Sequence, residues 1–408
     1  MSAPAVAVTE PTVPVSRAWT ARFSLVWLGV WMATLVPVQL ALPDQLDDID
    51  PAHKVRDFGL INGLVGIVAL ITLPLFGALC DRTRSRLGRR RVWVIAGVGV
   101  YAAGLLLTGL QTTWIAVGLA WAAASLGANM AMAGLTAAIA DEVPDGQRGY
   151  ISSAIYGPQA IGIVVGLIAV EGVHAAAARY AILAVALLAF ATPFIRAYRD
   201  VPPVAAAAPM LLRAVAGSLR IRSPDFGWAF GARLLVNLGN ALGTTYLLYF
   251  LRDDLRVHDP DGSLLVLTVI YLVFTLGATY AGGILSDRTG RRRVFVATAS
   301  ILQAIAALQL TFFPSFGTAL VAAAFLGAGY GAFMSVDQAL ITAVLPDAAD
   351  RARDLGIMNV GSVGPQALAP LAASLVIGSL GGYSMLFGAA GVVTLVGAVM
   401  VYRIRSVR

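Results

Sequence analysis

Two oppositely charged residues stand within long apolar stretches of the sequence. Arg233 lies eight residues after Asp225, and Asp337 lies eight residues before Leu345. Asp225 and Leu345 mark the ends of two predicted helices on the same side of the membrane. At 1.5 Å per residue, both charges lie about 12 Å from those ends. A charge at that depth in a membrane costs roughly 3 kcal/mol or more unless it is paired or hydrated. We therefore expect the two residues to meet.

Such a pair has two interpretations. As a buried ion pair, it fixes one helix against another. As a functional pair, it is a two-state switch, because protonation of Asp337 or an anionic solute group at Arg233 releases the partner. Ionisable groups within membrane helices commonly mark transport pathways, which favours the second interpretation.

Neutral hydrogen-bonding side chains accompany this pair. Asn237 and Asn240 follow Arg233 at spacings of four and three residues, which places the three on one helical face. Other polar amides inside apolar stretches are Gln39, Asn62, Asn129, Gln159, Gln338, Asn359 and Gln366. Each amide alone fits a bridge between helices, but together they predict a cavity for a small polar solute. Trp27 and Trp31, one turn apart, fit either a ring that stacks on a sugar or an interfacial aromatic belt.

A charged loop occurs twice in the chain. Three segments recur in the same order, at offsets of 206, 202 and 207 residues: Asp81-Arg82-Thr83 as Asp287-Arg288-Thr289, Arg89 to Val94 as Arg291 to Val296, and Gly157 to Ala160 as Gly364 to Ala367. Three matches indicate a duplicated unit. Because each unit holds six predicted spans, the two copies share one orientation, as in transporters built from parallel repeats.

The elements that carry these residues are membrane helices. The chain has 408 residues, 58% hydrophobic and 12% charged, whereas a soluble domain has about 25% charged residues. An apolar run of about 20 residues crosses a bilayer as a helix, and these runs are too long for barrel strands. We predict an all-α protein with twelve spans: 21–42, 58–80, 92–110, 114–140, 150–171, 179–196, 225–251, 263–285, 294–313, 316–345, 355–378 and 382–402.

The predicted organisation has five parts: a disordered tail (1–20), a six-helix bundle (21–196), a linker with one interfacial helix (197–224), a second six-helix bundle (225–402) and a short tail (403–408). The basic residues set the orientation. Of the 29 basic residues, the outside loops hold five (Lys54, Arg56, Arg179, Arg252 and Arg256) and Arg233 lies within a span. The other basic residues lie in the segments that we assign to the cytoplasmic side, which predicts that both termini are cytoplasmic.

At the repeated loops the sequence resembles the major facilitator superfamily. The family pattern Gly-x-x-x-Asp-Arg-x-x-Gly-Arg-Arg is met by Gly283, Asp287, Arg288, Gly290, Arg291 and Arg292. The first copy is a longer form that contains Gly77, Asp81, Arg82, Gly88, Arg89 and Arg90. This form is similar to that of glycoside–cation symporters and sucrose-transporter-like proteins. The resemblance implies two parallel-repeat six-helix bundles, alternating access, and a central cavity lined by spans 1, 4, 7 and 10.

The resemblance also implies a cytoplasmic gate at the repeated loops. A carboxylate at the start of a helix accepts bonds from free N–H groups and is favoured by the helix dipole. By the family pattern, Asp81 should meet the start of span 11 near Arg353 and Leu355. Asp287 should likewise meet the start of span 5 near Arg148 and Tyr150. The alternative is that the arginines anchor the loops on the cytoplasmic side.

The positions of the acidic residues indicate which ion could drive transport. Melibiose-type relatives carry cation-binding acids inside spans 2 and 4, whereas here Asp57, Asp81 and Asp141 lie at the ends of those spans. Sodium coupling of that type is therefore not expected. Asp337 is the deep carboxylate that would carry H⁺, and facilitated diffusion is the alternative.

The remaining features restrict the function classes. The one cysteine, Cys80, forms no intramolecular disulfide, and three histidines in separate loops do not predict a metal site. With no phosphate loop or nucleophile elbow, we expect neither an enzyme nor a cofactor, and the net charge of +7 fits the cytoplasmic loops better than nucleic acid. The partners expected are the lipid bilayer and a small-molecule solute, with the chain functional as a monomer.

We therefore predict a secondary active transporter in a bacterial plasma membrane, proton-coupled and moving a small polar, sugar-like solute. The alternatives are an efflux antiporter for an amphipathic compound and a non-transporting membrane receptor or scaffold.

Overall fold

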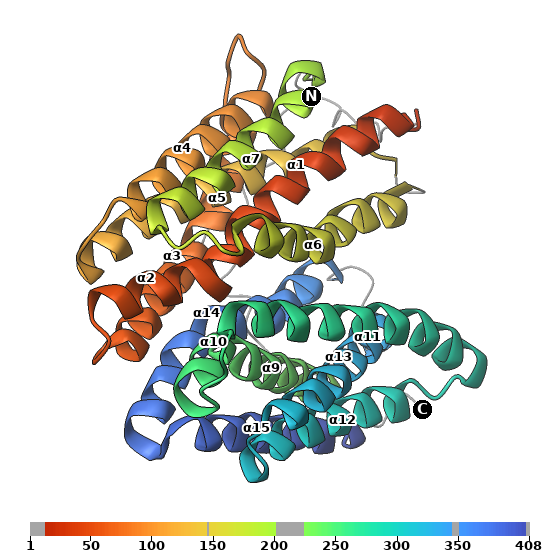
Figure 1. The fold of residues 1–408 in the computed structure, drawn as a ribbon. Helices are drawn as coiled ribbons and strands as arrows, with labels where there is room; N and C mark the ends of the chain where they lie inside the picture. Colours follow the sequence, from red (N-terminus) through yellow and green to blue (C-terminus); the bar gives the residue numbers. More distant parts are fainter. Residues whose placement is uncertain (1–12, 145–146, 201–223, 345–350, 405–408) are drawn as a thin grey trace. The chain divides into compact units, whose positions relative to one another are not determined.

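A computed structural model describes residues 13–144, 147–200, 224–344 and 351–404 (Figure 1). Most of the N-terminal tail, nearly all of the linker and the last four residues lie outside these ranges, so the predictions for them stay predictions. The described residues fold as helices that divide into two units. Unit 1 contains residues 1–50 and 67–211, and unit 2 contains residues 51–66 and 212–408.

Unit 1 is built from the helices of the first half of the chain. They are α1 (Arg17–Val36), η1 (Pro37–Ala41), α2 (Leu42–Ile49), the second part of α3 (Lys54–Arg82), α4 (Arg91–Gly109), α5 (Trp114–Glu142), α6 (Arg148–Val170) and α7 (Ala176–Ala197). Each of these helices begins and ends within a few residues of a predicted span, except that the first continues to Ile49.

Unit 2 is built from the helices of the second half and the first part of α3. They are α9 (Pro224–Thr245), α10 (Leu247–Tyr249), η3 (Phe250–Asp254), α11 (Pro260–Thr289), α12 (Arg292–Phe312), α13 (Phe316–Val344), α14 (Arg351–Leu380) and α15 (Gly382–Tyr402). In Figure 1 these helices run from green to blue.

Eleven described helices are long and apolar enough to cross a membrane, and a bent pair raises the number to twelve. The bent pair is α9 with the short helix that follows it, which meet at 42° near Tyr246. The predicted seventh span, 225–251, is therefore broken. The first span instead stays continuous through the π-helical turn at Pro37, where proline lacks the N–H that an α-helical ladder needs.

The packing order of the helices repeats between the two units. In unit 1, α1 packs against α6 and α7, while α4 packs against α5 and α7. In unit 2, the corresponding α9 packs against α14 and α15, while α12 packs against α13 and α15. Two bundles that pair equivalent helices in the same way are what the duplicated sequence predicts. The fold is therefore an all-α membrane fold of two parallel six-helix repeats.

Glycine permits close contacts between helix backbones within unit 2. Gly327 and Gly331 of α13 are four residues apart, and a Cβ on either would lie 2.2 or 2.1 Å from the carbonyl oxygen of Tyr271 or Thr275 on α11. The α11 and α13 backbones therefore touch directly, as small residues in membrane helices allow. On α9, Gly239 and Gly243 have the same spacing, but only Gly239 makes a close helix contact. Gly239 packs against Thr394, whereas Gly243 faces open space.

Helix α3 contributes to both units. A Cβ on Gly59 or Gly63 would collide with Ser374 or Leu371 of α14, so the first half of α3 packs within unit 2. In the second half, Thr72 accepts a hydrogen bond from Asn129 of α5 in unit 1. The two units therefore differ from the predicted bundles at residues 51–66.

Candidate functional site

The two deep charges predicted to meet are in contact inside unit 2. Nη1 of Arg233 on α9 lies 3.2 Å from Oδ2 of Asp337 on α13, and the two side chains are 8% and 6% exposed. Arg233 Nε also donates to Ser362 Oγ on α14 at 2.5 Å. A buried charge needs both a counter-charge and hydrogen bonds to offset its desolvation, and three helices provide them here.

The surroundings of the pair are apolar. Ala232 and Val236 flank Arg233 on α9, Phe333 and Val336 precede Asp337 on α13, and all four belong to one buried hydrophobic cluster. A low-dielectric environment strengthens the attraction between the charges and raises the cost of separating them. The pair therefore helps to hold α9 against α13 and, through Ser362, against α14.

Two amides near Arg233 have different surroundings. Asn237 Nδ2 donates to the backbone carbonyl of Arg233 at 2.8 Å, so that donor is used within α9. Asn240 Nδ2 is buried, and its polar neighbour among the described residues is the Tyr271 side chain. Its side chain lies beside Tyr271, whose ring stacks on Tyr330 with centroids 6.4 Å apart. This arrangement places a buried amide beside a pair of stacked aromatic rings.

The other predicted polar residues are dispersed. Asn129 bonds Thr72 within unit 1, and Asn62 Nδ2 donates to the Phe58 carbonyl of its own helix. Gln39 and Gln159 are partly buried in unit 1, and Gln366 is exposed on α14. The side chains of Gln338 and Asn359 lie outside the described set. Among the described residues, the predicted polar groups form one cluster, which contains Arg233, Asp337, Asn237 and Asn240. The other predicted amides that the structure describes do not form a second cluster.

The tryptophans at the start of the chain stack on one another. The rings of Trp27 and Trp31 lie 5.7 Å apart at 28°, and Trp27 also meets Phe23 edge to face. Trp27 is buried, and its indole face is covered by these neighbours. Its ring therefore contributes to the packing of α1, and both interpretations of the Trp27–Trp31 pair stay predictions.

The first repeated loop closes on itself through Arg90. Arg90 Nη1 lies 2.6 Å from Asp81 Oδ1, and its Nε lies 2.8 Å from Oδ2 of Asp141 at the end of α5. Arg89 reaches the same Asp141 at 2.9 Å. Burial alone lowers the pKa of Arg90, but its bonds to Asp141, Cys80 and Asp81 outweigh burial and raise that pKa. Burial raises the pKa of Asp141, but the bonds from Arg90 and Arg89 hold it below its ordinary value.

Asp200 fixes the other side of the same loop. Its two carboxylate oxygens accept the backbone N–H groups of Arg90 and Arg91 at 2.8 and 3.0 Å, at the start of α4. This is a favourable place for a carboxylate, because the first N–H groups of a helix have no partners within it. A Cβ on Gly88 would lie 1.8 Å from Asp200 Oδ2, which explains glycine at that position.

The two copies of the loop share a backbone feature. Gly88 has a φ of 104° and Gly290 a φ of 65°, a left-handed conformation that glycine adopts at little cost. Gly290 ends α11 in this conformation. Gly77 and Gly283 face open space in both copies. Gly88 and Gly290 are therefore required by the backbone conformation of the two repeated loops.

The side chains of the second loop that the structure describes differ in exposure. Arg288 and Arg291 are exposed, Arg82 is exposed in the first loop, and Arg292 is partly buried. The residue after it, Arg293, donates to the Ile404 carbonyl at 2.7 Å. The side chains of Asp287, Arg148 and Arg353 lie outside the described set, so the predicted gate contacts of Asp81 and Asp287 stay predictions.

Three functional candidates were not identified from the sequence. Ser362 binds the side chain of Arg233, and Asp141 binds the side chain of Arg90. Asp200 accepts a hydrogen bond from the Arg90 backbone. Ser362 follows Asn359 by three residues, so it shares a helical face with a predicted polar group. Asp141 lies at the end of a span, as does Asp81, and that matched position was the available signal.

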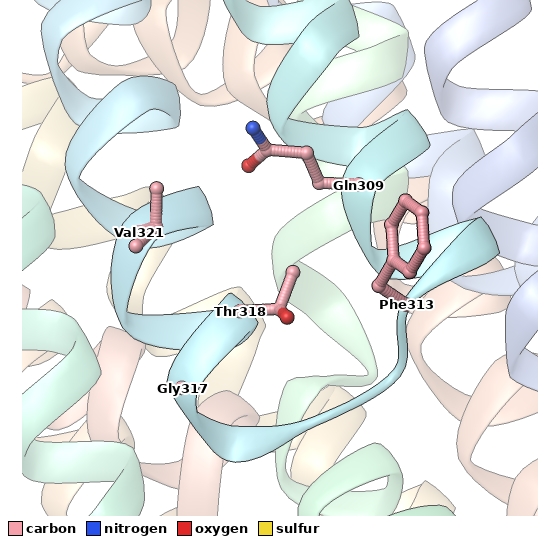
Figure 2. A pocket seen from close by; sticks show the side chains of 5 residues that line it. All are labelled: Gln309, Phe313, Gly317, Thr318 and Val321. Carbon is pink, nitrogen blue, oxygen red and sulfur yellow. The ribbon is translucent and has the colours of Figure 1, made fainter.

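A surface hollow of about 400 Å³ lies between the end of α12 and the start of α13 (Figure 2). It is lined by Gln309, Phe313, Gly317, Thr318 and Val321. Val321 is sixteen residues before Asp337 on α13, which is about 24 Å along the helix. The hollow is thus separate from the charged pair.

The chain matches the family profile described as Major Facilitator Superfamily over residues 23–258 and 229–408. No curated protein matches the chain. Together the two profile matches cover nearly the whole sequence, once for each of the two structural repeats. The helical fold, the repeated packing order and these matches agree. The chain belongs to the major facilitator superfamily and is a multi-pass membrane transporter.

Proposed function

We propose that this transporter is proton-coupled and moves a small, polar, sugar-like organic solute by alternating access. The observation that carries this proposal is the buried contact between Arg233 and Asp337, completed by Ser362. The two charges hold three helices of one bundle together. A proton that binds Asp337 cancels its charge and removes the ionic attraction to Arg233, whose hydrogen bond to Ser362 does not depend on that charge.

Proton coupling follows from the two states of this pair. With Asp337 ionised, the ion pair stabilises the contact of α9 with α13. With Asp337 protonated, the attraction is lost, and a solute group that accepts hydrogen bonds competes for Arg233. Solute and proton then each bias the same equilibrium between two helix arrangements, which is the thermodynamic requirement for coupling.

The solute class rests on the neighbours of the pair. Asn240 offers a buried amide beside Tyr271, and Tyr271 stacked on Tyr330 offers an aromatic face. A hydroxyl-bearing ring satisfies both, through a hydrogen bond to the amide and contact of its apolar face with the tyrosine. The long first loop, similar to that of glycoside–cation symporters, agrees with a sugar-like solute.

The same aromatic contact supports one alternative. The tyrosine stack continues to Phe333, with Tyr330 and Phe333 centroids 6.4 Å apart. A flat amphipathic compound would use this surface, and the protein would then export it in exchange for protons. A receptor that binds without transporting is the remaining alternative.

We place the protein in a bacterial plasma membrane as a functional monomer. The distribution of basic residues supports a cytoplasmic location for both termini and both repeated loops. A solute screen by thermal shift on the purified full chain tests the solute class. Sugars and polyols should raise the melting temperature, whereas lipophilic cations should not. Stabilisation by the cations alone would replace the proposal with efflux, and saturable binding without flux in proteoliposomes would favour the receptor.

A further inference from the structure

The surface hollow at the end of α12 contains a polar group without a partner. Figure 2 shows Gln309 and Phe313 on the α12 side of this hollow, and Gly317, Thr318 and Val321 on the α13 side. Gln309 Oε1 is buried and accepts no hydrogen bond from the residues that the structure describes. Because an acceptor shielded from water is costly to leave unpaired, a donor from outside the chain is expected here.

The first repeat has an apolar residue at the place of Gln309. At the offset of 202 residues that relates the arginine loops, Gln309 corresponds to Leu107. Helices α5 and α13 begin at Trp114 and Phe316, which differ by the same offset. The Leu107 side chain is 51% exposed, as a side chain that faces lipid would be. Gln309 therefore places an amide where the other repeat has a lipid-facing leucine, and an amide in that position needs a polar partner.

The two repeats also differ in what covers this end of the helix. In unit 1, Gln45 of α2 donates hydrogen bonds to the carbonyls of Thr108 and Gln111 at 2.8 and 3.1 Å, so α2 covers the end of α4. At the same offset, the residue of unit 2 that corresponds to Gln111 is Phe313. Phe313 lines the hollow and is 70% exposed. The end of α12 is therefore open at a place that the chain itself covers in unit 1.

The hollow lies at the level of the lipid headgroups. Both α12 and α13 are long and apolar enough to cross a membrane. With 21 residues, α12 is about 31 Å long, which matches a hydrocarbon core of about 30 Å. Gln309 lies about 4.5 Å before the end of α12, and the exposed Val321 lies about 7.5 Å below the start of α13. A molecule that contacts both residues has a polar part and an apolar part, as a phospholipid does.

We propose that the hollow is a binding site for a phospholipid with an ethanolamine headgroup. The ammonium group donates a hydrogen bond to Gln309 Oε1 and lies against the exposed Phe313 ring, whose face attracts a cation. Because the amide turns about its terminal bond, Oε1 reaches the hollow without a change in the backbone. One acyl chain lies along Val321.

The chemistry of the hollow selects among phospholipid headgroups. A choline headgroup has a cation but no N–H group, so it leaves the Gln309 acceptor unpaired. A glycerol headgroup has hydroxyl donors, but the lipid that carries it is anionic. The five residues that line the hollow carry no positive charge to bind such a lipid. Ethanolamine supplies both a donor and a cation, and its lipid has no net charge.

Lipid binding to the purified full-length protein tests this site. Native mass spectrometry in detergent counts the bound lipids as phosphatidylethanolamine or phosphatidylcholine is added. The wild-type protein should bind its first ethanolamine lipid at a concentration about 2- to 10-fold lower than its first choline lipid, the range that one net hydrogen bond supplies. Gln309→Leu, which introduces the residue of the first repeat, should remove this preference. Phosphatidylglycerol should bind equally to the wild-type protein and to Gln309→Leu.

A second variant and a control complete the test. A Cβ on Gly317 meets nothing within 4 Å, so Gly317→Phe adds a ring at the hollow without a clash at the backbone. It should also remove the preference. Thr298 is exposed on the same helix and bonds its own helix at the Val294 carbonyl, so Thr298→Val should keep the preference. Melting temperatures in detergent close to that of the wild-type protein show that each variant is folded.

Three results would overturn the proposal. The first is equal binding of the ethanolamine and choline lipids by the wild-type protein. The second is a preference for ethanolamine that persists in Gln309→Leu or in Gly317→Phe. The third is a loss of phosphatidylglycerol binding in Gln309→Leu, which would assign the hollow to an anionic lipid.

Discussion

Removing either charge of the Arg233–Asp337 pair should destabilise unit 2 much more than removing both. The two groups are 3.2 Å apart and more than nine-tenths buried. At an effective dielectric constant of about 20, Coulomb's law gives an attraction of about 5 kcal/mol at this distance. Breaking a buried pair by removing one partner typically costs about 3–5 kcal/mol, because the other charge is left uncompensated.

A double-mutant cycle measures this coupling. The variants are Arg233→Gln, Asp337→Asn and the double substitution, and the assay is the free energy of unfolding in detergent. Each single variant should lose about 3–5 kcal/mol, and the double variant should lose less than either single variant. Asp337→Asn should be the milder single change, because Arg233 keeps its bond to Ser362.

The pair Arg252–Asp261 serves as the control. Its N–O distance is 3.4 Å, but its side chains are 27% and 21% exposed. Solvent screening should reduce its coupling to about 1 kcal/mol or less. The two charges are not coupled if the loss of the double variant equals the sum of the two single-variant losses within about 0.5 kcal/mol. That result would refute this reasoning.

Two further predictions concern the loop and the packing. Asp141→Asn should lower stability by about 1.5–3 kcal/mol, since hydrogen bonds from two arginines are weakened. Because bonding holds the pKa of Asp141 below its ordinary value of 3.8, the wild-type protein has this stability above that value and loses it as pH falls through the lowered pKa. Melting curves against pH should therefore converge for the two proteins in acid, and a constant difference would contradict the assignment. Gly331→Val should cost about 1–3 kcal/mol or more by pushing α13 from α11, whereas Gly243→Ala, which faces open space, should leave the melting temperature nearly unchanged. Equal effects of these two variants would be the contrary result.

The helices and their repetition were largely predictable, because apolar length determines a span and duplicated motifs determine a repeat. The meeting of Arg233 and Asp337 was predictable from their equal depth, since the bilayer limits where isolated charges are tolerated. The family is confirmed by the profile matches, while the sugar-transporting branch stays a proposal.

The details that depend on contacts between distant helices were not predictable. Ser362 binds Arg233 across 129 positions of sequence, and no local spacing indicates that contact. Asn237 shares a helical face with Arg233 as predicted, but its donor is used by its own backbone, which periodicity does not reveal. The break in the seventh span near Tyr246 has no proline to mark it, whereas the continuous first span contains Pro37.

Uptake driven by a pH gradient tests the central claim most directly. Proteoliposomes that contain the wild-type protein should accumulate the solute identified by the thermal-shift screen when the gradient is applied. Asp337→Asn should still bind the solute and exchange it at equilibrium, but should show no accumulation above the level reached without a gradient. Accumulation by Asp337→Asn equal to that of the wild-type protein would contradict the assignment of this carboxylate as the coupling group.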